Sequence, residues 1–73
     1  MNENEFQTVV IDQTGLDIQL ADLTAPLDEV SGWASVYLLK LITALEQQTG
    51  RTMPISAMLE ATSLDAIRLA VPA

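Results

Sequence analysis

The residue best placed for chemistry in this sequence is Ser35, whose hydroxyl follows Gly32-Trp33-Ala34 at the start of an apolar helix. The chain contains no histidine and no cysteine, so it lacks the usual acid–base group, a thiolate nucleophile and the commonest metal ligands. Without a neighbouring base, Ser35 is not the nucleophile of a hydrolase. Two interpretations remain: Ser35 is the N-cap of the helix, with Trp33 closing the end of the core, or its hydroxyl is presented for covalent modification.

Composition and charge narrow the class of protein. The chain has 73 residues, 49% of them apolar, which predicts one small domain, residues 1–73, near the lower size limit for a single core. Ten acidic and three basic residues give a net charge of −7, which disfavours nucleic acid and anionic membranes and favours a basic protein surface as partner. Because there is neither a membrane-spanning apolar run nor a signal-peptide pattern, we expect a cytoplasmic protein.

Helical patterns account for most of the chain, and we expect an all-α fold, a small four-helix bundle. Asn4 with Gln7 suggests a capping pair at the start of a first helix over residues 4–14, which Gly15 ends. Residues 16–34 then form a long connection. Loops of this length are uncommon in small domains and are often functional.

The second helix gives the strongest signal and is expected over residues 35–49, ended by Gly50. Its core face should consist of Leu38, Leu41, Ile42 and Leu45. Its outward side carries Val36, Leu39, Thr43 and Gln47, flanked by Lys40 and Glu46. We interpret these six outward residues as a docking strip for partner proteins, while periodicity alone leaves open that neighbouring loops cover the apolar ones.

Two shorter helices complete the expected bundle. The third should cover residues 55–61, and Thr62 should cap the fourth, with Asp65 at its third helical position and Pro72 at its end. The residues expected to face inward are Ile55, Met58 and Leu59 in the third helix and Leu64, Ile67, Leu69 and Val71 in the fourth.

The order of these motifs resembles that of acyl and peptidyl carrier proteins, over essentially the whole chain. In that family the second helix begins with an Asp-Ser-Leu motif, often as Gly-Trp-Asp-Ser-Leu; residues 32–36 here read Gly-Trp-Ala-Ser-Val. The family continues with Leu-Glu, two mostly polar residues, Phe-Gly and a stretch ending in proline. Here residues 45–50 read Leu-Glu-Gln-Gln-Thr-Gly and residues 51–54 read Arg-Thr-Met-Pro. Residues 62–65, Thr-Ser-Leu-Asp, resemble the start of the family's last helix.

The resemblance implies that Ser35 receives 4′-phosphopantetheine from coenzyme A through a separate, magnesium-using phosphopantetheinyl transferase. The thiol of the arm would hold acyl or aminoacyl groups as thioesters for loading, condensing or tailoring enzymes. The carrier itself would not be an enzyme, and given its initiator Met1 and its length we expect a stand-alone monomer. The alternative is an unmodified, carrier-like module that docks partners through Val36, Leu39 and the acidic loop.

The sequence departs from the family pattern at positions that affect modification and partner choice. Ala34 stands in place of the motif's aspartate, which in the family helps the transferase engage the site. Lys40 and Gln47 stand where fatty-acid carriers often have glutamate. A positive Lys40 disfavours a strongly basic partner surface, which points to a specialised pathway such as polyketide or nonribosomal peptide biosynthesis.

The expected docking surface also includes three residues of the long connection. Asp28 and Glu29 should most simply form a solvated acidic turn, and contact with a transferase is the second interpretation of these two residues. Trp33 should act as a structural lid at the start of the second helix rather than contact a substrate. Since helical carriers admit a chain between their helices, the residues expected to contact cargo are the core-facing Leu38, Ile42, Met58 and Ile67.

Overall fold

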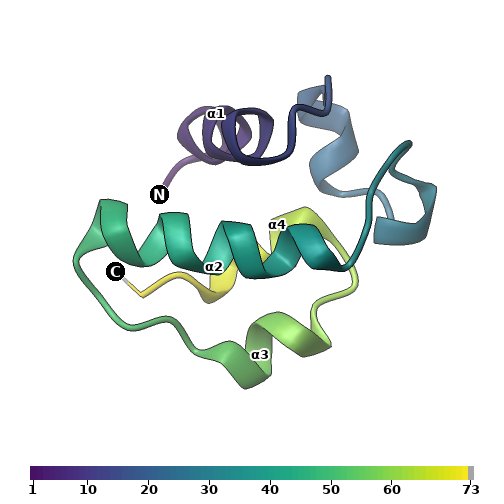
Figure 1. The fold of residues 1–73 in the computed structure, drawn as a ribbon. Coiled ribbons are helices and arrows are strands. Elements are labelled where there is room, and N and C mark those ends of the chain that lie inside the picture. Colours follow the sequence, from purple (N-terminus) through teal and green to yellow (C-terminus); the bar gives the residue numbers. More distant parts are fainter. Residues whose placement is uncertain (73) are drawn as a thin grey trace.

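The computed structural model describes residues 1–72 (Figure 1). Its four α-helices are α1 (Glu3–Thr14), α2 (Val36–Thr49), α3 (Ile55–Glu60) and α4 (Leu64–Ala70). The long connection between α1 and α2 contains two short 3-10 helices (Figure 1). The first, η1 (Leu20–Leu23), packs against α1 and α4, and the second, η2 (Leu27–Glu29), lies near the start of α2. Within residues 1–72 there is no β-strand, and the predicted small helical bundle with a short third helix is confirmed.

Helix α1 begins one residue earlier than predicted, and its cap differs. The side chain of Asn2 accepts a hydrogen bond from the backbone N–H of Glu5 at 2.8 Å, and the Glu5 carboxylate accepts one from the Asn2 backbone at 3.1 Å. This reciprocal capping box replaces the predicted pair of Asn4 and Gln7. Gln7 instead donates from its side chain to the carbonyl of Ile18 at 2.9 Å, which ties α1 to the connection that follows it.

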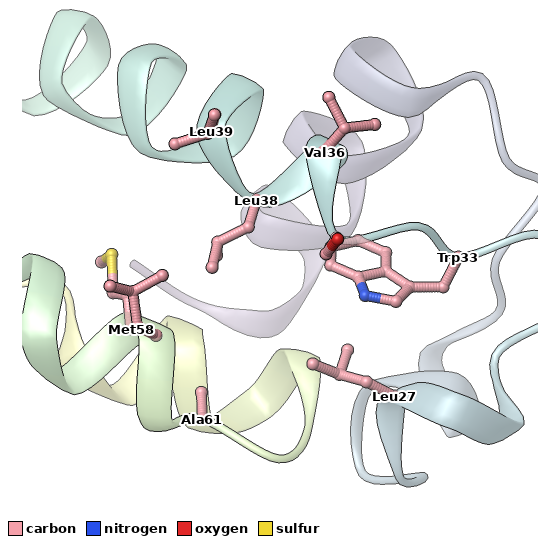
Figure 2. A pocket seen from close by; sticks show the side chains of 9 residues that line it. Leu27, Trp33, Val36, Leu38, Leu39, Met58 and Ala61 are labelled. Atoms are coloured by element: carbon pink, nitrogen blue, oxygen red, sulfur yellow. The ribbon is translucent and has the colours of Figure 1, made fainter.

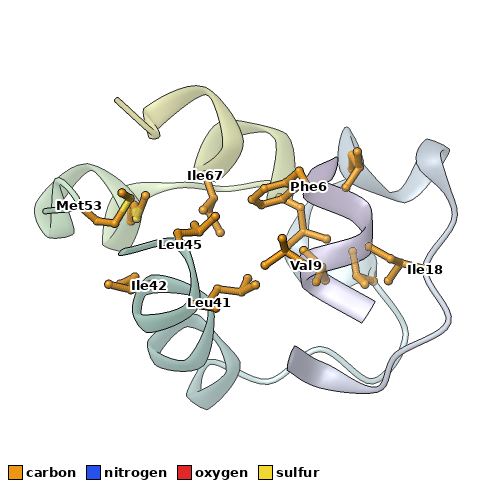
Figure 3. Close-up of a cluster of buried hydrophobic side chains, with 14 residues drawn as sticks. Phe6, Val9, Ile18, Leu41, Ile42, Leu45, Met53 and Ile67 are labelled. Atoms are coloured by element: carbon orange, nitrogen blue, oxygen red, sulfur yellow. The ribbon is translucent and has the colours of Figure 1, made fainter. Parts of the chain in front are cut away.

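The hydrophobic core lies where α1 and α2 meet, and α4 closes it (Figure 3). Three predicted core residues of α2 are buried, namely Leu41, Ile42 and Leu45, whereas the fourth, Leu38, is half-buried. The other buried apolar residues are Phe6, Val9, Val10, Ile18, Leu23, Val30, Ala44, Met53, Met58, Leu64 and Ile67. No polar or charged side chain is buried in the part of the chain that the structure describes, so packing stabilises this fold.

Three residues predicted to face inward are exposed instead. Ile55 and Leu59 of α3 are 50% and 63% exposed, and Leu69 of α4 is 69% exposed. Leu69 follows the buried Ile67 by two residues, which turns it about 200° away around the helix. Helix α3 has only six residues, and Met58 is the one among them that is buried.

The cap of α4 is Ser63, one residue after the predicted Thr62. The Ser63 hydroxyl accepts a hydrogen bond from the N–H of Ala66 at 3.1 Å, and its backbone is extended, as an N-cap requires. Thr62 has another role, since its carbonyl accepts the N–H of Leu27 at 2.9 Å. Asp65 therefore stands at the second helical position of α4 rather than the third. The Thr62–Leu27 hydrogen bond fixes η2 against the junction of α3 and α4.

Candidate functional site

The hydroxyl of Ser35 is exposed and unpaired among the described residues. Ser35 stands at the N-cap position of α2, but its side chain accepts no capping hydrogen bond. Its φ of −61° and ψ of −25° are already helical, whereas a capping serine needs an extended backbone to reach the N–H groups of the first turn. The N-cap interpretation of Ser35 is therefore wrong. What the structure leaves at the start of α2 is a free hydroxyl facing solvent.

The turn just before Ser35 is anchored on both sides. Gly32 adopts a left-handed conformation with a φ of 82°, which a residue with a side chain rarely adopts. Trp33 donates its backbone N–H to the carbonyl of the buried Val30 at 3.1 Å. The Trp33 ring also meets the ring of Tyr37 edge to face, with centroids 5.9 Å apart. These contacts hold the chain as it enters α2 and so set the position of the Ser35 hydroxyl.

An apolar groove of about 520 Å³ opens beside Ser35, between α2, α3 and η2 (Figure 2). Trp33 and Leu27 stand at one end of the groove, and Leu38 points from α2 toward α3 (Figure 2). The full lining consists of Leu27, Trp33, Ser35, Val36, Leu38, Leu39, Met58, Leu59 and Ala61. Ser35 is the only residue of that lining with a hydroxyl, and none of the nine is charged.

The docking strip on α2 is open to solvent. Val36 is 58% and Leu39 is 64% exposed, so the interpretation that neighbouring loops cover them is wrong. Lys40, Thr43 and Gln47 are exposed too. Leu39 lies between the apolar groove and a second, shallower hollow of about 310 Å³, which is lined by Gln13, Leu39, Lys40, Thr43, Ala44 and Gln47.

One predicted docking residue has a structural partner. Glu46 is half-buried, and its carboxylate accepts the backbone N–H of Met53 at 3.1 Å. This bond joins the last turn of α2 to the segment leading into α3. Lys40, by contrast, reaches toward solvent, with its ammonium nitrogen 5.8 Å from the centre of the Tyr37 ring, within the range of a cation–π contact.

The three residues of the connection that were predicted to join the docking surface, Asp28, Glu29 and Trp33, differ in how far their side chains are exposed to solvent. Asp28 and Glu29 are exposed on η2, as expected for a solvated acidic turn. Trp33 is half-buried. It packs against the hydrophobic core and also lines the groove beside Ser35.

Part of the lining had no adequate signal in the sequence. Leu27, Leu59 and Ala61 line the groove. The sequence pattern predicts Leu59 in the core, and the small, isolated Ala61 offers no pattern. Of the four predicted cargo contacts, Leu38 and Met58 line the groove, whereas Ile42 and Ile67 are buried in the core away from it.

Residues 1–72 hold no group of three or more His, Cys, Asp or Glu side chains that could bind a metal ion. No helix in the same part of the chain is long and apolar enough to cross a membrane. A group attached to Ser35 fits this site well. The hydroxyl is accessible from solvent, the first N–H groups of α2 favour an anion such as a phosphate ester, and an apolar groove lies alongside.

The family of the phosphopantetheine attachment site matches residues 4–70 of this chain. A comparison with individual curated proteins gave no match. The matched segment runs from α1 through α4 and includes Ser35 and every residue that lines the groove. Members of this family hold 4′-phosphopantetheine covalently and are not themselves catalytic. The chain therefore belongs to the phosphopantetheine attachment site family and is a carrier protein, which holds groups as thioesters on that cofactor and works with a phosphopantetheinyl transferase and biosynthetic enzymes.

Proposed function

We propose that Ser35 is the attachment residue and that the carrier serves a specialised biosynthetic pathway of the polyketide or nonribosomal peptide kind. The observation that carries the assignment of Ser35 is its exposed hydroxyl, which makes no capping bond although it stands at the N-cap of α2. Ser63, a genuine cap, is tied to the backbone by its hydroxyl. Ser31 is exposed as well, but it precedes the left-handed turn at Gly32 and lies outside the lining of the groove.

The attachment step follows from ordinary phosphoryl-transfer chemistry. The Ser35 oxygen attacks the phosphorus of coenzyme A that bears the pantetheine, and a serine O–P bond forms. The pyrophosphate P–O bond breaks, adenosine 3′,5′-bisphosphate leaves, and the hydroxyl proton passes to a base of the transferase. Magnesium bound by the transferase neutralises the phosphates. The carrier contributes an accessible hydroxyl and the helix N-terminus, which favours the negative phosphodiester.

The docking strip and the acidic turn are the proposed contact surface for the transferase and for loading, condensing or tailoring enzymes. Val36 and Leu39 offer exposed apolar area directly after Ser35, and exposed apolar residues gathered around a functional group are typical of binding surfaces. The charge on this surface is not uniform, because Lys40 projects from α2 whereas Asp28 and Glu29 project from η2. The glutamate on the strip, Glu46, is bound to a backbone N–H. Because the positive charge of Lys40 repels a strongly basic surface that docks on α2, its presence supports partners with a different charge.

Intact-mass spectrometry tests the attachment site directly. The protein is incubated with coenzyme A, magnesium and a broad-specificity transferase, beside the variants Ser35→Ala, Ser31→Ala and Ala34→Asp. We expect one phosphopantetheinyl increment on the wild type and on Ser31→Ala, none on Ser35→Ala, and faster modification of Ala34→Asp. An increment that persists in Ser35→Ala, or a wild type and an Ala34→Asp variant that both stay unmodified, would overturn the assignment.

A second candidate function is an unmodified interaction module with the carrier fold. The observation in its favour is Ala34, which is exposed beside Ser35 and offers no carboxylate to a transferase. In this case the docking strip would bind partners without a loaded arm. Modification of Ala34→Asp but not of the wild type, by a transferase that modifies other carriers, would favour this second function.

A further inference from the structure

The outward side of α2 presents a positive charge without a carboxylate partner. Helix α2 has two charged residues, Lys40 and Glu46. Glu46 is half-buried and accepts the backbone N–H of Met53, whereas Lys40 is exposed. Among residues 1–72 the one ion pair joins Arg68 to Asp65, so Lys40 forms none there. In a chain whose net charge is −7, this side of α2 is therefore locally positive.

Lys40 lines the hollow of about 310 Å³ between the end of α1 and α2. The amides of Gln13 and Gln47 belong to the same lining and can supply N–H donors. Gln13 donates to the Asp12 carboxylate at 3.3 Å, but Asp12 lines a different hollow. None of the six lining residues has a carboxylate; they are Gln13, Leu39, Lys40, Thr43, Ala44 and Gln47.

Aromatic contacts position the Lys40 side chain on the surface of α2. Its ammonium nitrogen lies 5.8 Å from the centre of the Tyr37 ring, and that ring meets the ring of Trp33 edge to face. A lysine held in this way loses less side-chain freedom when it binds a partner group. The next residue toward Ser35 is Leu39, which is 64% exposed and lines both this hollow and the groove beside Ser35. An apolar contact and a positive charge thus stand side by side on α2.

We propose that the hollow receives the carboxylate of one aspartate or glutamate side chain of a partner enzyme, while an apolar residue of that enzyme covers Leu39. The proposal rests on the proposed role of the docking strip as the partner surface, and it extends that surface to the end of α1. Lys40 supplies the charge, and the Gln13 and Gln47 amides supply further N–H donors for the carboxylate oxygens. A basic side chain in the same place would face the ammonium.

The net charge limits what kind of partner surface fits this hollow. Because the whole chain carries −7, a broadly acidic partner is repelled as it approaches. The surface that fits is therefore an apolar one with a single carboxylate, placed so that the carboxylate reaches Lys40 when the apolar part covers Leu39. Lys40 is then the residue that selects such a partner.

The test uses the full chain, isotope-labelled for NMR, and matched probe peptides. Each peptide is a stapled helix of neutral residues that carries a leucine and, one helical turn later, a glutamate, a glutamine or a lysine. We expect the glutamate peptide to shift the backbone amides of Gln13, Lys40, Thr43 and Gln47. The glutamine peptide should bind the same place about three- to tenfold more weakly, and the lysine peptide should bind most weakly.

Two charge reversals separate contact with Lys40 from the effect of overall charge. Lys40→Glu should invert the order of the peptides, so that the lysine peptide binds most tightly. Arg51→Glu changes the net charge equally at an exposed residue outside the lining of the groove and of the hollow, and it should keep the wild-type order. Added salt should narrow the difference between the glutamate and glutamine peptides in the wild type.

The possible failures can be told apart. Equal affinities of the glutamate and glutamine peptides, or an order that Arg51→Glu inverts as Lys40→Glu does, would overturn the carboxylate site. If Leu39→Ser then still weakens both peptides, the docking strip stands without it. If no peptide shifts an amide of α2, the carboxylate site and the docking strip are both wrong. The attachment at Ser35 survives either result, because intact mass tests it separately.

Discussion

Gly32 packs directly against the side chain of Leu16: a Cβ atom at Gly32 would lie 2.7 Å from Leu16 Cδ2. Such an approach is closer than real Cβ atoms make, so either the leucine must move or the backbone must shift. Gly32 also has a left-handed φ of 82°. The contact joins the segment that leaves α1 to the turn that presents Ser35, so both the close approach and the left-handed backbone favour glycine at this position.

Replacing Gly32 by alanine should destabilise the fold more than the same change at Gly15. Gly15 is also left-handed, with a φ of 73°, but nothing lies within 4 Å of a Cβ there. Gly15→Ala should therefore cost only the backbone strain, about 1–2 kcal/mol. Gly32→Ala should add about 1 kcal/mol, near the low end for overpacking, because the end of the Leu16 side chain can rotate away. Urea unfolding of both variants measures the difference, and equal losses of stability would contradict it.

Removing the hydroxyls of Ser35 and Ser63 should have opposite consequences. Ser63→Ala removes a capping bond to Ala66 and should lower the free energy of unfolding by about 1 kcal/mol. Ser35→Ala removes no such bond and should stay within about 0.5 kcal/mol of the wild type. Modification by the transferase should be lost in Ser35→Ala and kept in Ser63→Ala. A loss of stability in Ser35→Ala as large as that in Ser63→Ala would show that Ser35 caps α2 after all.

The helical fold was predictable from the sequence chiefly because α2 has a clear periodicity and because glycines mark where α1 and α2 end. Its apolar residues recur at helical spacing over four turns, and Gly15 and Gly50 mark where α1 and α2 end. The caps were predicted less well, because a local pattern of Asn followed three residues later by Glu or Gln occurs twice near the N-terminus. Which of two adjacent candidates caps a helix depends on the backbone, as at α4, where Thr62 is engaged by Leu27.

For the candidate site, the sequence indicated the hydroxyl but not the groove. The position of Ser35 and the outward direction of Val36 and Leu39 followed from one long helix, whereas periodicity left open whether neighbouring loops cover the two apolar residues. The groove instead requires η2 and α3 to lie on two sides of one space, which places Leu27 and Leu59 in the same lining, and no local spacing encodes that arrangement. Helix α3 has too few turns for periodicity to separate its buried side from its exposed side, which is why Leu59 was misplaced.

Glu46 should matter for stability rather than for docking. Its carboxylate accepts the N–H of Met53 at 3.1 Å, so Glu46→Ala should leave that part-buried donor unpaired and cost about 1–2 kcal/mol. Glu46→Gln keeps an acceptor and should recover most of this loss. Gln47→Ala, an exposed neighbour on the same helix, serves as the control and should stay within about 0.5 kcal/mol. Thermal and urea unfolding test all three, and an unchanged stability of Glu46→Ala would show that the bond contributes nothing.

The docking strip predicts that Leu39 affects association while leaving the fold intact. Leu39 is 64% exposed on α2 and Leu69 is 69% exposed on α4, so Leu39→Ser and Leu69→Ser remove similar exposed side chains from different surfaces. Neither should change the free energy of unfolding by more than about 0.5 kcal/mol. Only Leu39→Ser should raise the KM of the transferase for the carrier, by about five- to tenfold if the contact contributes about 1–1.4 kcal/mol.

Steady-state kinetics of modification, with the carrier as the varied substrate, separates association from chemistry in these two variants. A higher KM with unchanged kcat in Leu39→Ser means that the strip contributes to binding the transferase. A lower kcat with unchanged KM would instead mean that Leu39 affects how the Ser35 hydroxyl is presented. Equal effects of Leu39→Ser and Leu69→Ser would remove the basis for assigning partner contact to α2, because the transferase would then not distinguish the surface beside Ser35 from that of α4.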